Sequence, residues 1–408
     1  MNETTIHHAT WVIPVAYPPI PDGAVAVQNS TITDVGAYKD VIKRNATSTV
    51  QEHYDSVLLP ALINAHIHLE LSHIDLSNQH KNITGFTNWI EKLLATRERV
   101  GAVGDVPVQA ALDMLKQQYN HGVIGLGDVG NTDIVENFSD KFPGILLHFN
   151  EVLGRSPKSR RSILHKIDQA DKTKLFTAHA PYSTHAELIQ AVKLRAKNLS
   201  HPFSIHVAEP PSESELLNQG SGDLYDFLIQ RGFIDKTYKP PAEIDKPGSV
   251  QYLNMLGVLD KQTICVHCIH VNSKEIQILA ETKTNICLCP GSNRYLNVGR
   301  APVKQFLDHG LTPALGTDSR ASNPELSIWR EMRLLKEDHP EVKSLEILKM
   351  ATFGGALALG IDKNYGSLEK GKKAQFLAVK LSGDFQDSDS LYKFLITQNE
   401  DIQPNWVK

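Results

Sequence analysis

Short β-rich runs alternate with amphipathic helical stretches from Val57 onward, and this alternation limits the fold more than any other feature of the sequence. The eight candidate strands are residues 57–65, 122–129, 145–151, 175–180, 203–208, 263–267, 284–288 and 312–316. Apolar residues between them recur at spacings of three and four, as in residues 86–100, 106–120, 184–197 and 303–309. Eight such units predict a parallel, closed (β/α)₈ barrel (TIM barrel), with a doubly wound open sheet as the alternative.

The two ends of the chain have a different character. Short candidate strands joined by turns lie at residues 11–15, 24–28 and 32–35, and the same style returns at residues 376–379. Neither end is large enough to bury a core by itself. We therefore expect one small β-sandwich domain built from residues 1–57 and 366–408, packed beside a barrel domain of residues 58–365.

Charge and hydropathy exclude several classes of protein. The 408 residues carry a formal net charge of -4 with no basic block, so the footprint of a nucleic-acid or anionic-membrane binder is missing. No apolar run approaches the roughly 20 residues of a membrane helix, and residues 1–8 lack the cationic start of a signal peptide. The sequence predicts a cytoplasmic protein with a small-molecule substrate and no nucleic-acid or membrane partner, with a homodimer as an open option.

The four cysteines form a C-x-x-C at Cys265 and Cys268 and a C-x-C at Cys287 and Cys289. Such pairs can hold a structural zinc ion, but zinc ribbons place them in tight turns. Here each pair lies in or beside a β-rich run. We therefore favour buried free thiols over a zinc site or disulfides.

Two histidines, His66 and His68, end the first candidate strand in the run N-A-H-I-H. Alternation along a strand points both side chains the same way, at the carboxyl end where barrel enzymes build their active sites. Taken alone, they could be histidines satisfied by ordinary hydrogen bonds. Imidazole and carboxylate groups also end three later strands: His206 with Glu209, His267, and Asp318. Three neutral imidazoles and one carboxylate suit Zn²⁺ or Fe²⁺ better than Mg²⁺ or Ca²⁺.

Six stretches of the chain carry a family resemblance. They are N-A-H-I-H at 64–68, H-A-P-Y-S at 179–183, H-V-A-E at 206–209, V-H-C-I-H at 266–270, C-P-G-S-N-R-Y-L at 289–296 and G-T-D-S-R-A-S-N at 316–323. Together they resemble the amidohydrolase superfamily, in its cytosine, adenosine and S-adenosylhomocysteine deaminase-like branch. One departure is Gln375, where relatives commonly carry aspartate.

The resemblance implies roles for the residues at the strand ends. His66, His68, His206 and Asp318 would bind one divalent metal ion per chain, Zn²⁺ first and Fe²⁺ second. Two-metal relatives bridge their ions with a carboxylated lysine from the fourth strand, whereas this chain has Thr177 there. The implied reaction is a hydrolytic deamination in which Glu209 protonates a ring nitrogen. His267 and Asp318 would take the proton of the attacking water.

Motifs of rival chemistries are incomplete or absent. The residues His68-Leu69-Glu70 match the H-x-E of another zinc deaminase fold, but that fold also needs a P-C-x-x-C, which the sequence lacks. The sequence also has no H-E-x-x-H and no G-x-S-x-G.

The segments H-L-E-L-S at 68–72 and F-T-N-W-I at 86–90 resemble aminodeoxyfutalosine deaminases of menaquinone biosynthesis. We expect Glu70 and Ser72 to hydrogen-bond the purine or ribose, and Trp89 to cover the ring. Arg155 would pair with a substrate carboxylate, and His179 would contact the ribose. The alternatives are a core aromatic for Trp89 and a solvated loop charge for Arg155.

Three functional hypotheses follow. The first is a deaminase of a 6-aminopurine nucleoside, with aminodeoxyfutalosine before adenosine, methylthioadenosine, S-adenosylhomocysteine or a cytosine-type substrate. The second is an amidohydrolase or chlorohydrolase acting on another heterocycle. The third is a metal-stabilised binding protein, for which Glu209 and His267 would be surplus.

Overall fold

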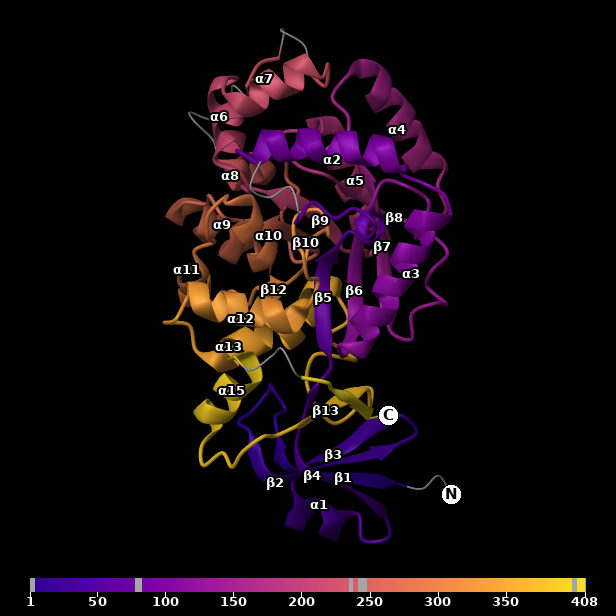
Figure 1. Ribbon diagram of the computed structural model, residues 1–408, viewed down its shortest axis with the longest axis vertical. Helices are drawn as coiled ribbons and strands as arrows, with labels where there is room; N and C mark the ends of the chain where they lie inside the picture. The colour runs from indigo at the N-terminus through magenta and orange to yellow at the C-terminus, as the bar shows by residue number, and fades with distance from the viewer. Residues whose placement is uncertain (1–3, 78–82, 235–237, 241–247, 398–401, 408) are drawn as a thin grey trace.

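The computed structural model describes residues 4–77, 83–234, 238–240, 248–397 and 402–407 (Figure 1). Two regions divide these residues. A six-stranded sheet, at the bottom of Figure 1, contains both ends of the described chain, and a larger body of parallel strands surrounded by helices lies above it. No helix among these residues combines the length and the apolar character needed to cross a bilayer.

Eight strands of the larger body form two parallel sheets of four. The first sheet contains β5 (Leu62–Ile67), β6 (Val123–Gly130), β7 (Ile145–Val152) and β8 (Leu175–Ala178). The second contains β9 (Phe203–Val207), β10 (Thr263–His267), β11 (Asn285–Leu288) and β12 (Ala314–Leu315). Within each sheet, neighbours in space are neighbours in sequence. The expected alternating α/β architecture with parallel sheets is confirmed.

The two parallel sheets approach each other at both of their edges. Beside β8, the backbone N–H of His206 donates to the carbonyl of His179 at 2.9 Å. Beside β5, the backbone N–H of Asp318 donates to the carbonyl of His66 at 3.1 Å, and Ile67 forms a parallel bridge with Asp318. The ends of strands that are far apart in sequence are therefore held within hydrogen-bonding distance.

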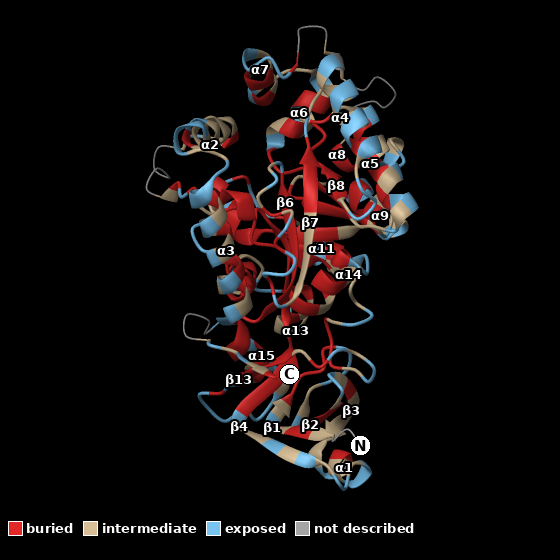
Figure 2. Ribbon diagram, turned by 90° about the vertical axis from the view of Figure 1, so that its right-hand side faces the viewer, coloured by how far each residue is buried: buried red, intermediate tan, exposed pale blue. Residues whose placement is uncertain are grey.

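Helices surround these strands, whose residues are mostly buried (Figure 2). They are α2 (Phe86–Val100), α3 (Asp105–Asn120), α4 (Pro157–Gln169), α5 (Ala186–Leu199), α6 (Pro211–Gln219), α7 (Asp223–Gln230), α8 (Ser249–Met255), α9 (Ser273–Thr282), α10 (Pro290–Leu296), α11 (Val303–Asp308), α12 (Ile328–Asp338), α13 (Ser344–Lys349) and α14 (Gly355–Leu359), with the short 3₁₀ helix η1 (Leu69–Leu71) and the π-helix η3 (Met350–Gly354). The four helical stretches expected from apolar spacing correspond to α2, α3, α5 and α11.

The first expected strand, residues 57–65, is in fact parts of two strands. Strand β4 (Thr49–Pro60) belongs to the small sheet, and β5 begins two residues later at Leu62. The whole stretch from Val57 to Ile67 is buried, because it passes from the interior of one sheet into that of the next. No polar residue therefore marks the change of sheet.

The small sheet contains strands from both ends of the chain. Its order is β14-β13-β4-β1-β2-β3, with β1 (Thr5–Val12), β2 (Ile20–Gln28), β3 (Thr31–Ala37), β13 (Phe376–Lys380) and β14 (Asn405–Val407). The segment before β13 also pairs with β3, since the N–H of Ile32 donates to the carbonyl of Lys372 at 2.8 Å. The sheet thus curls over its own apolar face, and α1 (Tyr38–Arg44) packs against it. The described strands of both chain ends therefore lie in one curled sheet.

The segment after residue 366 is not confined to this sheet. Helix α15 (Ser388–Thr397) packs against α12 and α13 of the larger body. Trp406 of β14 stacks on Tyr119 of α3, with ring centroids 4.5 Å apart, and its Nε1 donates to the Tyr119 carbonyl at 2.9 Å. The end of the chain therefore fastens the two regions together.

Candidate active site

Six polar side chains converge at the carboxyl ends of the parallel strands. They are His66 in β5 and His68 after it, His206 in β9 and Glu209 after it, His267 at the end of β10, and Asp318 after β12. All six are more than nine-tenths buried. Concentrating so many ionisable groups in a buried place is costly unless they bind a ligand or one another.

Four of these residues form a cluster with metal-ligand character. The ligand-type atoms of His66, His68, His206 and Asp318 all lie within 4.8 Å of one another. The Nε2 atoms of His66 and His206 are 3.1 Å apart, and Oδ1 of Asp318 lies 3.3 Å from Nε2 of His68. The structure therefore brings together the four residues expected to hold one cation.

Hydrogen bonds from outside the cluster orient its ligand atoms. Nδ1 of His206 donates to the carbonyl of His179 at 2.8 Å, which leaves the lone pair on Nε2. Oδ2 of Asp318 accepts from the hydroxyls of Ser292 at 2.6 Å and Ser322 at 2.8 Å, so Oδ1 is the atom that faces the histidines. Supporting groups of this kind are typical of metal centres.

Burial sets the protonation states that a metal requires. It lowers the pKa of His66 to about 4, and together with the neighbouring imidazoles it lowers the pKa of His206 well below its usual range. Burial opposes ionisation of Asp318, but the hydrogen bond to His66 and the nearby imidazoles hold its pKa well below the ordinary value. Neutral imidazoles and an ionised carboxylate are the forms that bind a cation.

Glu209 and His267 lie beside the cluster, with Oε1 of Glu209 3.6 Å from Nε2 of His267. Burial, with the charges of Asp318 and Glu213, raises the pKa of Glu209 well above its ordinary value, which favours its proton-donating form. Nδ1 of His267 lies 3.0 Å from Oδ1 of Asn293, an acceptor, so Nδ1 carries the proton and Nε2 is the basic atom.

Three strand ends adopt a left-handed backbone at residues other than glycine. The φ angles are +52° at Ala208, +72° at His267 and +58° at Asp318. Such conformations cost about 1–3 kcal/mol each and persist where the surrounding structure enforces them, often at active sites. Close packing adds a further constraint, because a Cβ at Gly316 would lie 2.7 Å from Cβ of His66.

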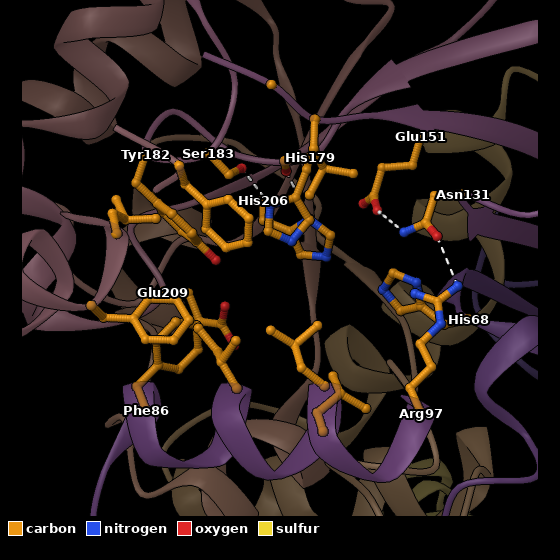
Figure 3. Close-up of a pocket in the computed structure, with 18 of the residues that line it drawn as sticks. His68, Phe86, Arg97, Asn131, Glu151, His179, Tyr182, Ser183, His206 and Glu209 are labelled. Atoms are coloured by element: carbon orange, nitrogen blue, oxygen red, sulfur yellow. Dashed lines mark hydrogen bonds between the residues drawn. The ribbon is translucent and has the colours of Figure 1, made fainter. Parts of the chain in front are cut away.

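A cavity of about 460 Å³ opens above the cluster (Figure 3). His68, His206, Glu209, His267 and Asp318 line it. One wall is the inner face of α2, which contributes Phe86, Trp89, Ile90, Leu93, Leu94 and Arg97. Of these six, only Phe86 is buried; the apolar residues of this face pack partly against small core clusters and also form the cavity wall.

The sequence profile of the Amidohydrolase family matches residues 57–407, which is most of the chain. The chain belongs to this family. The expected enzyme class, a hydrolase acting on carbon–nitrogen bonds, is thereby confirmed.

Relatives of this amidohydrolase align over nearly its full length. A 5-methylthioadenosine/S-adenosylhomocysteine deaminase from Thermoanaerobacter pseudethanolicus is 29% identical over 386 residues, 88% of this chain and 80% of the relative. An aminodeoxyfutalosine deaminase from Nitratiruptor sp. is 26% identical over 392 residues, 92% of each chain. The fold is similar to that of Helicobacter pylori aminofutalosine deaminase solved with methylthio-coformycin, with a TM-score of 0.82, 24% identity, and coverage of 99% of this chain and 97% of that one.

Four of the five expected substrate-binding residues line the cavity of the amidohydrolase: Glu70, Trp89, Arg155 and His179. Nδ1 of His179 lies 2.6 Å from the hydroxyl of Ser183. Trp89 donates from Nε1 to the carbonyl of Ala321 at 3.0 Å, so it is both anchored and part of the cavity wall. Arg155 also lines the cavity, whereas Ser72 is not among its lining residues. A direct contact of Ser72 with substrate is therefore not supported.

Glu70 lines the cavity, but its carboxylate is already occupied. Oε2 accepts from the backbone N–H groups of Asn131 at 3.1 Å and Thr132 at 2.8 Å, and from the Thr132 hydroxyl at 2.5 Å. Oε1 pairs with Nη2 of Arg97 at 3.1 Å. These bonds favour a role for Glu70 in holding the loop after β6 and Arg97, in place of the expected contact with the purine or ribose.

Sequence reasoning missed several residues of the amidohydrolase site. Ser292, Asn293 and Ser322 lie inside the quoted family motifs, so the sequence marked these positions. Their hydrogen-bond partners, Asp318 and His267, are known only from the structure. Arg97 continues the spacing of three and four that runs along α2 from Phe86. The spacing by itself does not say that Arg97 faces the cavity.

The cysteines take no part in the site. All four are buried and free, as expected for core thiols. Cys265 lies in β10 and Cys287 in β11, where they pack in the main core cluster.

Proposed function

We propose that this chain is a metal-dependent hydrolytic deaminase of a 6-aminopurine nucleoside. The observation that carries the proposal is the juxtaposition of the four-residue cluster with Glu209 at the inner end of the cavity. A binding protein would not need a buried carboxyl group, with a pKa that burial raises well above its ordinary value, beside a basic histidine nitrogen.

The residues present fit a single divalent cation. His66, His68, His206 and Asp318 would hold it, because their ligand-type atoms converge. In His206 and Asp318, hydrogen bonds to residues outside the cluster also occupy the atom that faces away from the cation site. Three imidazoles and one carboxylate favour Zn²⁺, with Fe²⁺ as the alternative. When bound, the cation would lower the pKa of water from 15.7 toward ~7.

The protein's own groups would move the protons. Nε2 of His267 accepts one proton of the attacking water, and the carboxylate of Asp318 orients that water. The carboxyl group of Glu209 donates a proton to the ring nitrogen next to the carbon under attack, which makes that carbon electrophilic. The water oxygen forms the new carbon–oxygen bond. The bond to the amino group then breaks as its nitrogen accepts the proton held by His267 and leaves as ammonia. The remaining proton of the added hydroxyl returns to Glu209 as the carbonyl forms.

The cavity supports a nucleoside that carries an apolar or aromatic substituent and a carboxylate. The wall formed by α2 offers an apolar surface to such a substituent. Arg155 makes its hydrogen bonds to the carbonyls of Pro181, Tyr182 and Thr184, and among the described residues it has no carboxylate partner. An arginine without an acidic partner beside a cavity favours an anionic ligand group. Aminodeoxyfutalosine is our leading candidate, before methylthioadenosine and S-adenosylhomocysteine.

We expect the enzyme to convert aminodeoxyfutalosine to its hypoxanthine product with a higher kcat/KM than any competitor. The assay follows ammonia release side by side for aminodeoxyfutalosine, adenosine, methylthioadenosine, S-adenosylhomocysteine and cytosine. A preference for methylthioadenosine or S-adenosylhomocysteine would support the proposed reaction and contradict the proposed substrate. Inactivity on every adenine nucleoside, or preference for cytosine, would refute the proposal.

Replacing Arg155 by alanine should lower kcat/KM by roughly one to two orders of magnitude for the carboxylate substrate and much less for methylthioadenosine. The reason is the lost charge-assisted hydrogen bond. Arg155 also donates hydrogen bonds to three backbone carbonyls. The Arg155→Lys variant therefore serves as a control that keeps the positive charge without all of these hydrogen bonds. Equal losses for both substrates in Arg155→Ala would assign Arg155 a structural role.

We further infer that the two parallel sheets close into one (β/α)₈ barrel, with residues 1–57 and 366–408 supplying the small sheet. The contacts between β8 and β9 and between β12 and β5 support the closure. Closure would explain why four strand ends surround one cluster. A cytoplasmic location, a place in menaquinone biosynthesis and a homodimeric assembly stay predictions of the sequence.

A further inference from the structure

Glu151 is a buried carboxyl group that the proposed reaction does not use. It lies near the end of β7, is 9% exposed, and lines the cavity. Its Oε1 is buried and has no hydrogen-bond partner among the residues that the structure describes. Buried polar atoms in native structures are nearly always paired, so an unpaired acceptor in a cavity points to a group that a ligand supplies.

A chain of hydrogen bonds fixes the direction of this carboxylate. Its Oε2 accepts from Nδ2 of Asn131 at 3.3 Å, and Oδ1 of Asn131 accepts from Nη2 of Arg97 at 2.8 Å. The same Nη2 is bound to Glu70 at 3.1 Å. Figure 3 shows Glu151, Asn131 and Arg97 in this order along one side of the cavity. With Oε2 held from outside, Oε1 is the atom left for a ligand.

The charges at this end of the cavity select the kind of group that binds. Arg97 is compensated by Glu70, and Asn131 is neutral, so Glu151 contributes an excess negative charge. An anionic group such as a carboxylate or phosphate would be repelled here, whereas a neutral hydrogen-bond donor would be accepted. A carboxylate substituent of the substrate is therefore directed to Arg155 and not to this end.

A hydroxyl group fits the available atoms. The ligand-type atoms of Glu151, His179 and His206 lie within 4.8 Å of one another, and Nδ1 of His179 is already bonded to Ser183. His179 and Glu151 thus each bring a hydrogen-bonding atom close enough for one hydroxyl to reach both residues. A second cation is a weaker interpretation, because His206 belongs to the four-residue cluster and its Nε2 is directed at His66.

We propose that Glu151 determines sugar specificity by accepting a hydrogen bond, through Oε1, from a hydroxyl of the substrate ribose. This inference rests on the proposed nucleoside deaminase function. It makes the substrate a nucleoside with an intact ribose, and it makes 2′- or 3′-deoxynucleosides poor substrates. A site built to bond a hydroxyl rejects an analogue without it, because its own polar group is then left unpaired.

The test compares kcat/KM for adenosine, 2′-deoxyadenosine and 3′-deoxyadenosine in the parent enzyme and in Glu151→Gln and Glu151→Ala. We expect the parent to favour adenosine over at least one deoxy analogue by about 10- to 100-fold. In Glu151→Ala this ratio should fall toward one, since activity on adenosine drops while activity on that analogue does not. The ratio for Glu151→Gln should lie between those of the parent and Glu151→Ala. All variants should keep the parent's metal content.

A matched control is Glu136→Gln, which makes the same change in a carboxylate that pairs with Lys174 at 2.8 Å and does not line the cavity. It should retain the parent's ratio. Equal use of adenosine and both deoxy analogues by the parent, retention of the ratio by both Glu151 variants, or loss of metal from them would each overturn the assignment. If the parent deaminates no adenine nucleoside, the proposed function fails and this inference fails with it. Deamination without sugar discrimination rejects the role of Glu151 alone.

Discussion

Replacing Glu209 by glutamine is expected to lower kcat by about 10²- to 10⁴-fold, the usual contribution of one acid–base group, and to leave the metal content unchanged. The amide has nearly the same shape as the carboxyl group but cannot deliver a proton to the ring nitrogen. Glu209 lies outside the four-residue cluster, so its loss removes proton transfer and not ligation. Steady-state kinetics and elemental analysis of the same preparation measure the two quantities.

Glu215→Gln provides the control for this prediction. Glu215 lies in α6, six residues after Glu209, and its side chain is exposed to solvent. The same substitution there should leave both kcat and metal content near those of the parent. Near-normal turnover by Glu209→Gln would mean that another group shuttles the proton. Loss of metal would mean that Glu209 supports the cluster in addition to the chemistry.

Much of the fold could be predicted because its strands are short, apolar and separated by amphipathic helices. Strand β10 and helix α2 have the bounds expected from the sequence, and β7 differs by one residue. The stretch around β4 and β5 could not be divided in this way. Its residues are buried on both sides of the boundary at Ala61, so hydropathy carries no signal of the passage between sheets.

The curled small sheet was unpredictable for a related reason. Its closure depends on pairing between β3 and residues about 340 positions later, such as Thr31 with Lys373. Alternation within each strand indicates that one face is buried, but it does not say whether a second sheet or the same sheet covers that face. Local pattern therefore yields the strands but not their partners.

The same distinction separates the site residues that were expected from those that were missed. The sequence identifies four site residues because each is an ionisable residue at the end of an apolar strand: His66, His206, His267 and Asp318. Ser292 has no such mark, and it bonds Asp318 across 26 positions of sequence. Supporting residues of this kind are defined by their partners and not by their own chemistry.

Helix α2 gives the clearest case of a pattern with two meanings. Its apolar stripe satisfies the spacing of a helix that packs on a core, yet the stripe lines the cavity. A ligand surface and a core surface both exclude water, so hydropathy alone does not separate them. The polar residue that ends the stripe, Arg97, is the feature that favours the cavity.

Replacing His66 by alanine is expected to remove the metal and to lower kcat by more than the upper bound of about 10⁴-fold for losing one acid–base group. His66 is fully buried, and its Nε2 lies within 4 Å of both His206 and Asp318, so its loss removes a ligand atom from the centre of the cluster. Elemental analysis should give one metal per parent chain and well under one per variant chain. Chelation should inactivate the parent, and added Zn²⁺ should restore the parent but not His66→Ala, which separates ligation from folding.

The solvent-exposed His309 offers a control, because His309→Ala should keep both metal and activity. A reproducible ratio near two metals per parent chain would defeat the single-metal interpretation, and a full metal complement in His66→Ala would remove His66 from the ligand set.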